Sequence, residues 1–375
     1  PRHYRCNDGN GDCRNPSMKT DNVVVDENPP LPRFAQIEPI GRCNLACRMC
    51  TVNERIDAVG EMSIDRFRSL LDQLPGLETL HLQGLGEPML HPAFFDMVEL
   101  AAARGIRVSA NTNLTLLTPA RALRCVTCGL ASLSVSIDGA SREVYQAIRR
   151  KASFDKVVRN LDRLMRTRAE HRSRLEVRGV MVLIRSNLDE LPALLRLLHA
   201  HGVPELLVQR LSSDLEQAGL APGYIPIRDY VRGAQLRPED LEHAQAVFDD
   251  ARTLADSLGL SLHLPRLAPK MRASASVSAS VSVSVSASAS ASADAAAPRC
   301  RWPWEQIYVT AAGELLPCCM VATADRASFG NVFDGTSDGL RRRWHSEDAQ
   351  AFRRALASDS PPDVCRGCAL YRGTF

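Results

Sequence analysis

The sequence predicts an α/β fold in which parallel strands alternate with helices. Between residue 34 and about residue 215, short apolar runs that suit buried strands alternate six times with segments whose apolar residues recur at helical spacing. Such alternation implies parallel strands joined by right-handed crossovers. The sheet is then either doubly wound or a barrel, complete or partial. In each case the functional loops follow the carboxyl ends of the strands.

The expected elements follow one another in a regular order. A cysteine-containing loop follows the first strand, and Ser63 can cap the next helix because apolar side chains from Ile64 to Leu74 fall on one face. Gly105 ends the second helix and Thr118 caps the third. Strands are expected at residues 33–40, 78–84, 106–111, 131–138, 174–184 and 205–211, and helices at 63–74, 92–105, 118–129, within 141–168, and at 188–202.

The chain divides into five segments by composition. Residues 1–33 form a polar N-terminal arm that is expected to be loosely ordered, and residues 34–215 form the core. Residues 216–272 are expected to be a helical connection. Residues 273–298 alternate Ser, Ala and Val without large side chains, which predicts a disordered linker. Residues 299–375 form a small cysteine-rich C-terminal extension.

The overall composition is that of an ordinary globular protein. The chain has 375 residues, of which 45% are apolar and 24% charged, and a formal net charge of +3. This charge indicates no nucleic-acid or acidic-membrane partner. The polar N-terminus lacks the apolar segment of a secretory signal, and no apolar run is long enough to span a bilayer. Clustered cysteines in a long chain indicate metal or redox chemistry, so we expect a cytoplasmic protein with reduced thiols.

The segment CNLACRMC, residues 43–50, carries the most specific chemical signal. Cys43, Cys47 and Cys50 follow the first predicted strand in the spacing C-x3-C-x2-C. Thiolates this close together select zinc or an iron–sulfur cluster. Three cysteines can hold three irons of a cubane and leave the fourth iron open to another ligand. The alternative is a structural zinc site that a histidine completes.

This spacing after the first strand of a β/α chain resembles the signature of the radical S-adenosylmethionine (radical SAM) enzymes. Later segments at the carboxyl ends of predicted strands resemble further elements of that family: GLGEP (84–88), ANTN (110–113) and SIDGASREVYQAIR (136–149). The resemblance covers roughly residues 34–215 and implies a partial (β/α)6 TIM-like barrel. It also implies SAM contacts from Gly84, Gly86, Glu87, Pro88, Asn111, Thr112, Asn113, Ser136 and Asp138.

Three positions depart from the family pattern. Leu85 separates two glycines that the family has side by side, although a small, flexible loop with one carboxylate still suits a cationic amine. Asn113 replaces a glycine, which is tolerable because asparagine also adopts left-handed backbone conformations. Met49 stands where the family often has an aromatic residue.

The resemblance implies a specific chemistry for the three-cysteine loop. In the family, the open iron of a [4Fe–4S] cluster binds the amino and carboxylate groups of SAM. One electron from the reduced cluster cleaves the sulfonium to methionine and a 5′-deoxyadenosyl radical, which abstracts a substrate hydrogen. The cofactor does the chemistry, and the protein positions it and excludes competing reactions. An electron donor such as flavodoxin or ferredoxin is therefore an expected partner.

Cys300, Cys318, Cys365 and Cys368 form a second group. The stretch at residues 306–319 predicts a β-hairpin that turns at Gly313. Its spacing to the first two of these cysteines resembles the SPASM and Twitch extensions of many radical SAM proteins, and the chain's end after CRGC favours the shorter Twitch form. The resemblance implies an auxiliary [4Fe–4S] cluster for electron transfer or substrate positioning. Ligand identity alone leaves a four-thiolate zinc site as the alternative.

The five other cysteines receive no ligand role. Cys319 is expected to be a buried thiol, with a substitute ligand or a hydrogen-atom donor as alternatives. Cys125 and Cys128, at the end of a predicted helix, are expected to be a buried packing pair, with a redox or metal role as the alternative. Cys6 and Cys13 flank the acidic stretch NDGNGD, which lacks the glycine and closing glutamate of a calcium loop.

The function that the sequence favours is a radical SAM enzyme of oxidoreductase type that oxidises or epimerises a small molecule. Only 42 residues precede Cys43, too few for the recognition domain that many peptide modifiers carry at that end. The alternative is a maturase that modifies a peptide or protein, and a distant alternative is a non-catalytic zinc-binding protein. No catalytic residue is assigned, and the nine histidines are scattered without ligand spacing.

Overall fold

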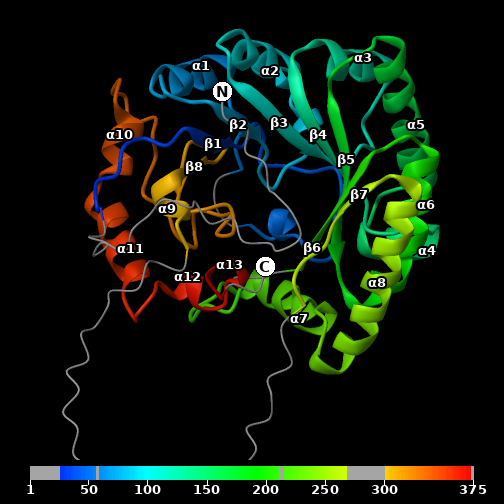
Figure 1. The fold of residues 1–375 in the computed structure, drawn as a ribbon. Helices are drawn as coiled ribbons and strands as arrows, with labels where there is room; N and C mark the ends of the chain where they lie inside the picture. Colours follow the sequence, from blue (N-terminus) through cyan, green and yellow to red (C-terminus); the bar gives the residue numbers. More distant parts are fainter. Residues whose placement is uncertain (1–25, 56–58, 212–214, 268–299, 373–375) are drawn as a thin grey trace, which may run out of the picture.

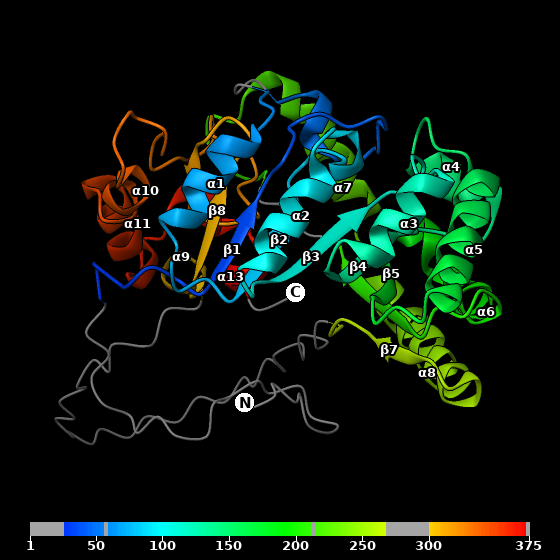
Figure 2. The ribbon, with the colours of Figure 1, turned by 90° about the horizontal axis from the view of Figure 1, so that it is seen from above.

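A computed structural model describes residues 26–55, 59–211, 215–267 and 300–372 of the chain. Within these residues the centre of the molecule is a nine-stranded sheet in the order β7-β6-β5-β4-β3-β2-β1-β8-β9. All neighbouring strands are parallel except β8 and β9. The sheet is curved, and helices α1 to α6 cover its outer side (Figures 1 and 2). The α/β partial barrel predicted from the sequence is confirmed.

The strands have the following bounds: β1 (Phe34–Ile37), β2 (Thr79–Leu82), β3 (Arg107–Thr112), β4 (Leu130–Ser136), β5 (Glu176–Leu183), β6 (Glu205–Arg210), β7 (Ser261–His263), β8 (Gln306–Val309) and β9 (Leu315–Leu316). The core helices are α1 (Ile64–Asp72), α2 (Phe94–Ala103), α3 (Pro119–Thr127), α4 (Arg142–Ile148), α5 (Phe154–Glu170), α6 (Leu191–Ala200), α7 (Ile225–Ala234) and α8 (Leu241–Leu258). The C-terminal helices are α9 (Trp302–Glu305), α10 (Gly339–Trp344), α11 (Glu347–Ala357), α12 (Asp363–Arg366) and α13 (Ala369–Arg372). Short 3-10 helices are η1 (Thr51–Asn53), η2 (Pro88–Leu90), η3 (Arg185–Glu190), η4 (Pro222–Tyr224) and η5 (Pro238–Asp240).

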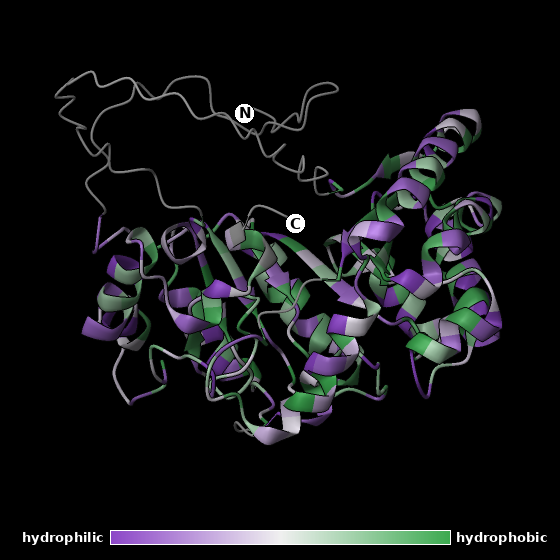
Figure 3. Ribbon diagram, turned by 90° about the horizontal axis from the view of Figure 1, so that it is seen from below, coloured by the Kyte–Doolittle hydropathy of each residue, from purple (hydrophilic) through white to green (hydrophobic). Residues whose placement is uncertain are grey.

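The core strands and helices form where the sequence predicts them. The Ser63 side chain accepts a hydrogen bond from the Arg66 amide and caps α1, and Thr118 caps α3 through the Arg121 amide. Helices α1 to α6 bury apolar side chains at helical spacing, and Figure 3 shows hydrophobic and hydrophilic residues alternating along the helices. Burial of these side chains forms the main hydrophobic core.

The C-terminal hairpin continues the sheet of the core. The predicted turn at Gly313 is confirmed, since this residue has φ of +96° between the antiparallel strands β8 and β9. The sequence did not predict that β8 would pair in parallel with β1, from Phe34 opposite Gln306 to Ile37 opposite Val309. The expected helical connection likewise contains a short strand, β7, that pairs with β6. The second cysteine group is therefore attached to the sheet edge next to the first.

The end of the predicted N-terminal arm is ordered by contacts with the C-terminal helices. The indole nitrogen of Trp304 donates to the Asp26 carbonyl, and that of Trp344 donates to the Pro29 carbonyl. Arg353, fully buried, donates to the Glu27 carbonyl. The expectation of a loose arm is therefore wrong for residues 26–33. Residues 273–298, Cys6 and Cys13 lie outside the described residues.

Two smaller cores accompany the main one. Ile148, Ile184, Tyr224 and Ile227 belong to a core beneath α7, and Val321, Leu356, Val364 and Cys365 belong to a core of the C-terminal region. In the described part of the chain, no helix is long and apolar enough to cross a membrane.

Candidate active site

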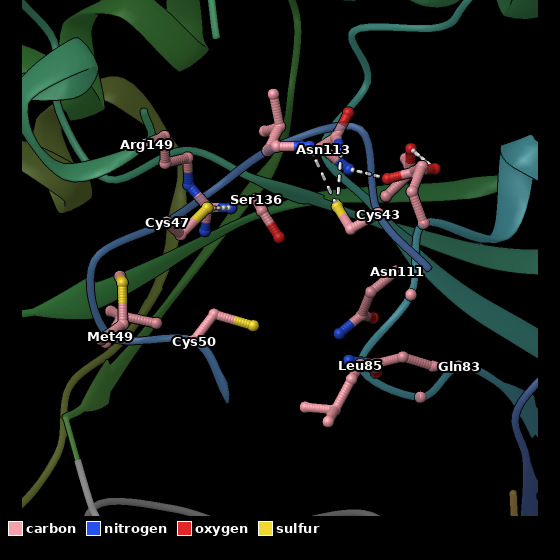
Figure 4. Close-up of a pocket in the computed structure, with 16 residues that line it drawn as sticks. Cys43, Cys47, Met49, Cys50, Gln83, Leu85, Asn111, Asn113, Ser136 and Arg149 are labelled. Atoms are coloured by element: carbon pink, nitrogen blue, oxygen red, sulfur yellow. Dashed lines mark hydrogen bonds between the residues drawn. The ribbon is translucent and has the colours of Figure 1, made fainter. Parts of the chain in front are cut away.

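The three cysteines of the CNLACRMC loop converge on one cavity. The loop links β1 to η1, and it is fixed to the end of α4 because the Ala46 amide donates to the Arg150 carbonyl and the Arg48 amide to the Ile148 carbonyl. The sulfur atoms of Cys43, Cys47 and Cys50 point into the same space, a cavity of about 240 Å³ (Figure 4). The cavity lies at the carboxyl ends of the strands, as predicted for parallel sheets.

Hydrogen-bond donors surround two of the sulfur atoms. The Leu45 amide lies 3.4 Å and the Asn113 Nδ2 atom 3.8 Å from the Cys43 sulfur. The Arg149 guanidinium donates to the Cys47 sulfur over 3.9 Å. Burial raises the pKa of these thiols, that of Cys50 to about 12. A bound metal cluster reverses this effect because its positive charge favours the thiolate. A set of three thiols with donors directed at their sulfurs fits a metal–sulfur cluster.

The cavity walls favour a cluster over a single zinc ion. Among the described residues that line the cavity there is no histidine, which the zinc alternative requires as its fourth ligand. Zinc binds thiolates at roughly 2.3 Å and so draws its ligands close together. A four-iron cubane is larger and holds its cysteines farther apart than one zinc ion does.

The GLGEP loop needs glycines for close packing. A Cβ atom on Gly84 would lie 2.3 Å from the Glu38 carboxylate, and one on Gly86 would lie 1.9 Å from the Ile40 carbonyl oxygen. Both glycines therefore let the loop approach the segment that follows β1. Close approach, and not the flexibility expected from the sequence, explains the small residues.

Glu38 is a buried carboxylate that the sequence analysis missed. Its side chain is 0% exposed and pairs with the Arg55 guanidinium at 3.3 Å. It also accepts hydrogen bonds from the amide of Leu85 in the GLGEP loop and from the amide of Ala311 after β8. One carboxylate thus joins the first strand, the GLGEP loop and the C-terminal hairpin. Little in the sequence indicates this role, since a single Glu after a strand is common.

Glu87 connects the GLGEP loop to the end of β3. One carboxylate oxygen accepts the Thr112 hydroxyl at 2.7 Å and the other the Asn113 amide at 2.7 Å. Burial raises the pKa of Glu87, and these hydrogen bonds oppose that effect. Glu87 lines the cavity with its neighbours Gly84, Gly86 and Leu85. Its contact with SAM remains a prediction, and the structure adds that the carboxylate also orders β3.

Asn113 does not adopt the left-handed conformation expected of it. In the described residues the positive φ of this loop, +59°, belongs to Leu114. Asn113 instead donates to the Asn44 side chain and accepts from the Thr115 hydroxyl, which leaves its amide group beside Cys43. The sequence predicts only that asparagine is tolerable here, whereas in the structure its side chain forms hydrogen bonds to Asn44 and Thr115. Asn44 of the cysteine loop is a further residue that the prediction missed.

The segment after β4 contributes a buried ion pair. Asp138 is 0% exposed, accepts the Val182 amide at 2.8 Å and pairs with the Arg149 Nε atom at 2.7 Å. Although burial opposes it, the Asp138 carboxylate raises the pKa of Arg149. Arg149 and Ser136 line the cavity, whereas Asp138 stands behind Arg149. The cofactor contact of Asp138 remains a prediction, and Arg149 is a cavity residue that our prediction did not assign.

The remaining predicted residues have clear positions. Asn111 and Thr112 at the end of β3 line the cavity, and Figure 4 shows the Asn111 side chain directed toward the cysteines. Pro88 is buried at the start of η2. Cys125 and Cys128 are buried in the main core, as the packing interpretation expects.

The second cysteine group is also assembled. Cys300 and Cys318 pack against the small C-terminal core that contains Cys365, and Cys300 lies within electrostatic reach of Cys368. Cys365 and Cys368 are buried around α12. These contacts place the four predicted ligands in one region of the C-terminal part of the chain, and their cluster remains a prediction.

Cys319 is not the buried thiol that was expected. It is half-buried and lines a separate cavity of about 260 Å³ together with Met320 and Leu215. This cavity shares Met49, Cys50 and Leu85 with the cavity of the three cysteines. The two spaces therefore adjoin at Cys50, between the cysteine loop and the C-terminal region.

Two family models match the chain. The model of the radical SAM superfamily matches residues 37–198. The model of the SPASM iron–sulfur cluster-binding domain matches residues 300–369. The two matches cover the first and second cysteine groups, respectively.

Curated relatives match shorter stretches. A tungsten-containing aldehyde ferredoxin oxidoreductase cofactor-modifying protein of Pyrococcus furiosus is 31% identical over 188 residues, which are 48% of this chain and 51% of that protein. Mycofactocin maturase MftC of Mycobacterium tuberculosis is 35% identical over 123 residues, or 32% of either chain. The chain therefore spans between about a third and about half of the length of these relatives.

A solved structure agrees in fold. SuiB of Streptococcus suis bound to precursor peptide SuiA has a TM-score of 0.64 and 16% sequence identity, over 91% of this chain and 70% of that one. At this identity the likeness concerns the fold.

Proposed function

The chain belongs to the radical SAM superfamily and carries a C-terminal iron–sulfur domain of the SPASM type, and from this premise we propose that it modifies a peptide. Its cofactors are a [4Fe–4S] cluster, SAM and auxiliary iron–sulfur chemistry in the C-terminal domain. Cys43, Cys47 and Cys50 are the proposed ligands of the first cluster. Cys300, Cys318, Cys365 and Cys368 are the proposed ligands of an auxiliary [4Fe–4S] cluster.

When bound, the cluster and SAM supply a one-electron cleavage that generates a hydrogen-abstracting 5′-deoxyadenosyl radical. The chain's own residues hold the reactants in place. Asn113 and Arg149 donate to the thiolate sulfurs and stabilise their ligand form. Asp138 fixes the orientation of Arg149 through their buried ion pair. Ser136 and Asn111 offer polar groups inside the cavity for the cofactor's polar ends.

The proposed substrate site is the cavity beside Cys319. Its walls include the apolar side chains of Met49, Leu85, Leu215 and Val231, and it adjoins the cofactor cavity. An apolar side chain of a peptide would be desolvated there, next to the place where hydrogen abstraction occurs.

The observation that carries the peptide proposal is the similarity to mycofactocin maturases, at 35% identity over 123 residues. The fold match to SuiB, solved with a precursor peptide, is consistent with it. The small-molecule substrate that the sequence favoured has less support, because it depended on how few residues precede Cys43. Oxidation or epimerisation of a small molecule is the outcome that would replace the peptide proposal.

The test is anaerobic reconstitution followed by a turnover assay. We expect about eight irons per chain, from two four-iron clusters, and release of 5′-deoxyadenosine on reduction. Peptides deuterated at side-chain positions should transfer deuterium to 5′-deoxyadenosine. Bound zinc without 5′-deoxyadenosine would reject the enzyme proposal. Label transfer from deuterated sugars or aminocyclitols, with none from peptides, would reject the peptide substrate alone.

A further inference from the structure

A second hollow reaches the cysteine loop from another side. It has a volume of about 300 Å³, and its walls include Arg48, Arg150 and Tyr230 of α7. Its described lining residues overlap with those of the cofactor cavity only at Cys47 and Cys50. These two cysteines therefore form a wall that the cofactor cavity contacts on one face and the second hollow on the other.

The mouth of this hollow carries positive charge that the fold does not neutralise. Arg48 and Arg150 are exposed and lie close together, because the cysteine loop is hydrogen-bonded to the chain at Ile148 and Arg150. The Arg48 guanidinium stacks over the Tyr230 ring at 4.3 Å from its centroid, which holds the side chain at the mouth. Lys151 is also exposed beside Arg150.

Other arginines nearby form ion pairs with acidic side chains, whereas, among the residues described, the basic ones at the mouth of the hollow do not. Arg42 pairs with Glu61, and Arg232 pairs with Glu216. In the described chain, Arg48, Arg150 and Lys151 form no ion pair with any acidic side chain. Glu54 is the acidic residue among those that line the hollow, so the mouth keeps a net positive charge.

The proposed function requires one electron from a donor protein. The cofactor cavity has little room for such a donor to approach the cluster. SAM and substrate occupy that cavity and the one beside it, so a protein donor must approach the cluster from elsewhere. Cys47 and Cys50 line the second hollow, behind a basic rim. A basic rim attracts an acidic partner and orients it before contact.

We propose that the surface formed by Arg48, Arg150, Lys151 and Tyr230 docks a small acidic one-electron carrier protein, and this rests on the proposed function. The carrier is oxidised by one electron and the cluster behind Cys47 and Cys50 is reduced by one. No bond is formed or broken in this step, and no proton is moved.

The experiment measures both binding and electron delivery in the reconstituted protein, with a flavodoxin as the acidic carrier. Its Kd is measured by calorimetry, and 5′-deoxyadenosine formation is measured with reduced flavodoxin and, separately, with dithionite. In the double variant Arg48→Glu/Arg150→Glu, we expect the Kd to rise about tenfold or more. We expect the ratio of flavodoxin-driven to dithionite-driven rate to fall by a similar factor. The wild-type Kd should rise with salt.

The matched control reverses two exposed arginines far from the loop, Arg159 on α5 and Arg341 on α10, and should leave the Kd and the ratio as in wild type. Equal Kd and equal ratio in the loop variant and wild type would overturn the docking surface, as would an equal loss in the control. Failure of the proposed function looks different. Wild-type protein would then release no 5′-deoxyadenosine with dithionite, while the binding measurement would still report on the surface.

Discussion

The two cysteine groups are held by different means. Cys43, Cys47 and Cys50 lie on one loop, and their surroundings come from the ends of β3 and α4 through hydrogen bonds to the sulfurs. The second group is packed into a small hydrophobic core with Val321 and Leu356. The first arrangement leaves the thiols facing a cavity, whereas the second buries Cys365 and Cys368 and leaves Cys300 and Cys318 half-buried. The fold thus builds an open site from strand ends and a closed site from apolar packing.

The two sites are also mechanically joined. Glu38 lies between them, with its carboxylate bound to the GLGEP loop on one side and to Ala311 of the C-terminal hairpin on the other. The parallel pairing of β1 with β8 runs alongside this contact. An iron–sulfur domain that shares a sheet with the core is placed by the register of the shared strands.

The largest effect should come from removing one ligand of each group. We expect Cys50→Ala to lose about four irons per chain, and with them all release of 5′-deoxyadenosine. We expect Cys365→Ala to lose a similar amount of iron but to retain SAM cleavage with dithionite, because its cluster is closed. Iron analysis and chromatography of the nucleoside measure both. Equal loss of SAM cleavage in the two variants would contradict the proposed functional difference between the two sites.

The next largest effect concerns the carboxylate that joins the two regions. Glu38→Ala removes the buried carboxylate that pairs with the Arg55 guanidinium and accepts the amides of Leu85 and Ala311. Breaking a buried pair from one side costs about 3–5 kcal/mol of unfolding free energy. Chemical denaturation of the reconstituted protein measures the loss.

The matched control is Glu78→Ala, which removes an exposed partner of Arg33 and should cost less than about 1 kcal/mol. Similar losses in Glu38→Ala and Glu78→Ala would mean that Glu38 does not join the two regions.

The sequence predicted the elements that depend on local pattern. Strand and helix positions follow from apolar periodicity, and the caps at Ser63 and Thr118 follow from side chains that bond amides three residues later. The hairpin at Gly313 likewise needs only local turn chemistry. Each of these features is decided by residues that are neighbours in the chain.

The sequence could not predict contacts between distant segments. The pairing of β1 with β8 joins residues more than 270 positions apart, as Phe34 and Gln306 show. Glu38 has partners in three separate segments, and the residues near it in the chain do not predict them. Asn113 was assigned to the site by its resemblance to a family element, but its neighbours Asn44 and Cys43 come from another loop. Such residues acquire their roles only when the sheet closes around the site.

A smaller effect should follow from weakening the support of the open site. Asp138→Asn keeps an acceptor for the Val182 amide but removes the charge that orients Arg149. Loss of an outer partner of a metal ligand typically weakens metal binding about 10–100-fold. The rate of iron loss to a chelator should rise for the first cluster only, and spectroscopy of the two clusters separates them.

The control replaces an exposed ion pair in the same region, with Asp155→Asn beside Arg142. Faster loss of the auxiliary cluster in Asp138→Asn would contradict the view that the two groups are supported independently.

The smallest effect is a pH dependence on the side of the open site. His91 follows η2, is buried, accepts the Ala93 amide at Nδ1 over 3.0 Å and meets the Met62 carbonyl at Nε2 over 2.9 Å. Burial lowers the pKa of His91, because desolvation disfavours the imidazolium. The unfolded chain then binds the proton first as pH falls below about 6.5, so acidification reduces stability. His91→Gln should show a shallower loss of thermal stability between about pH 7.5 and pH 5.5 than wild type, whereas exposed His171→Gln should match wild type. If His91→Gln kept the wild-type slope, the acid sensitivity would have to arise elsewhere, and the open site would be no more sensitive to pH than the closed one.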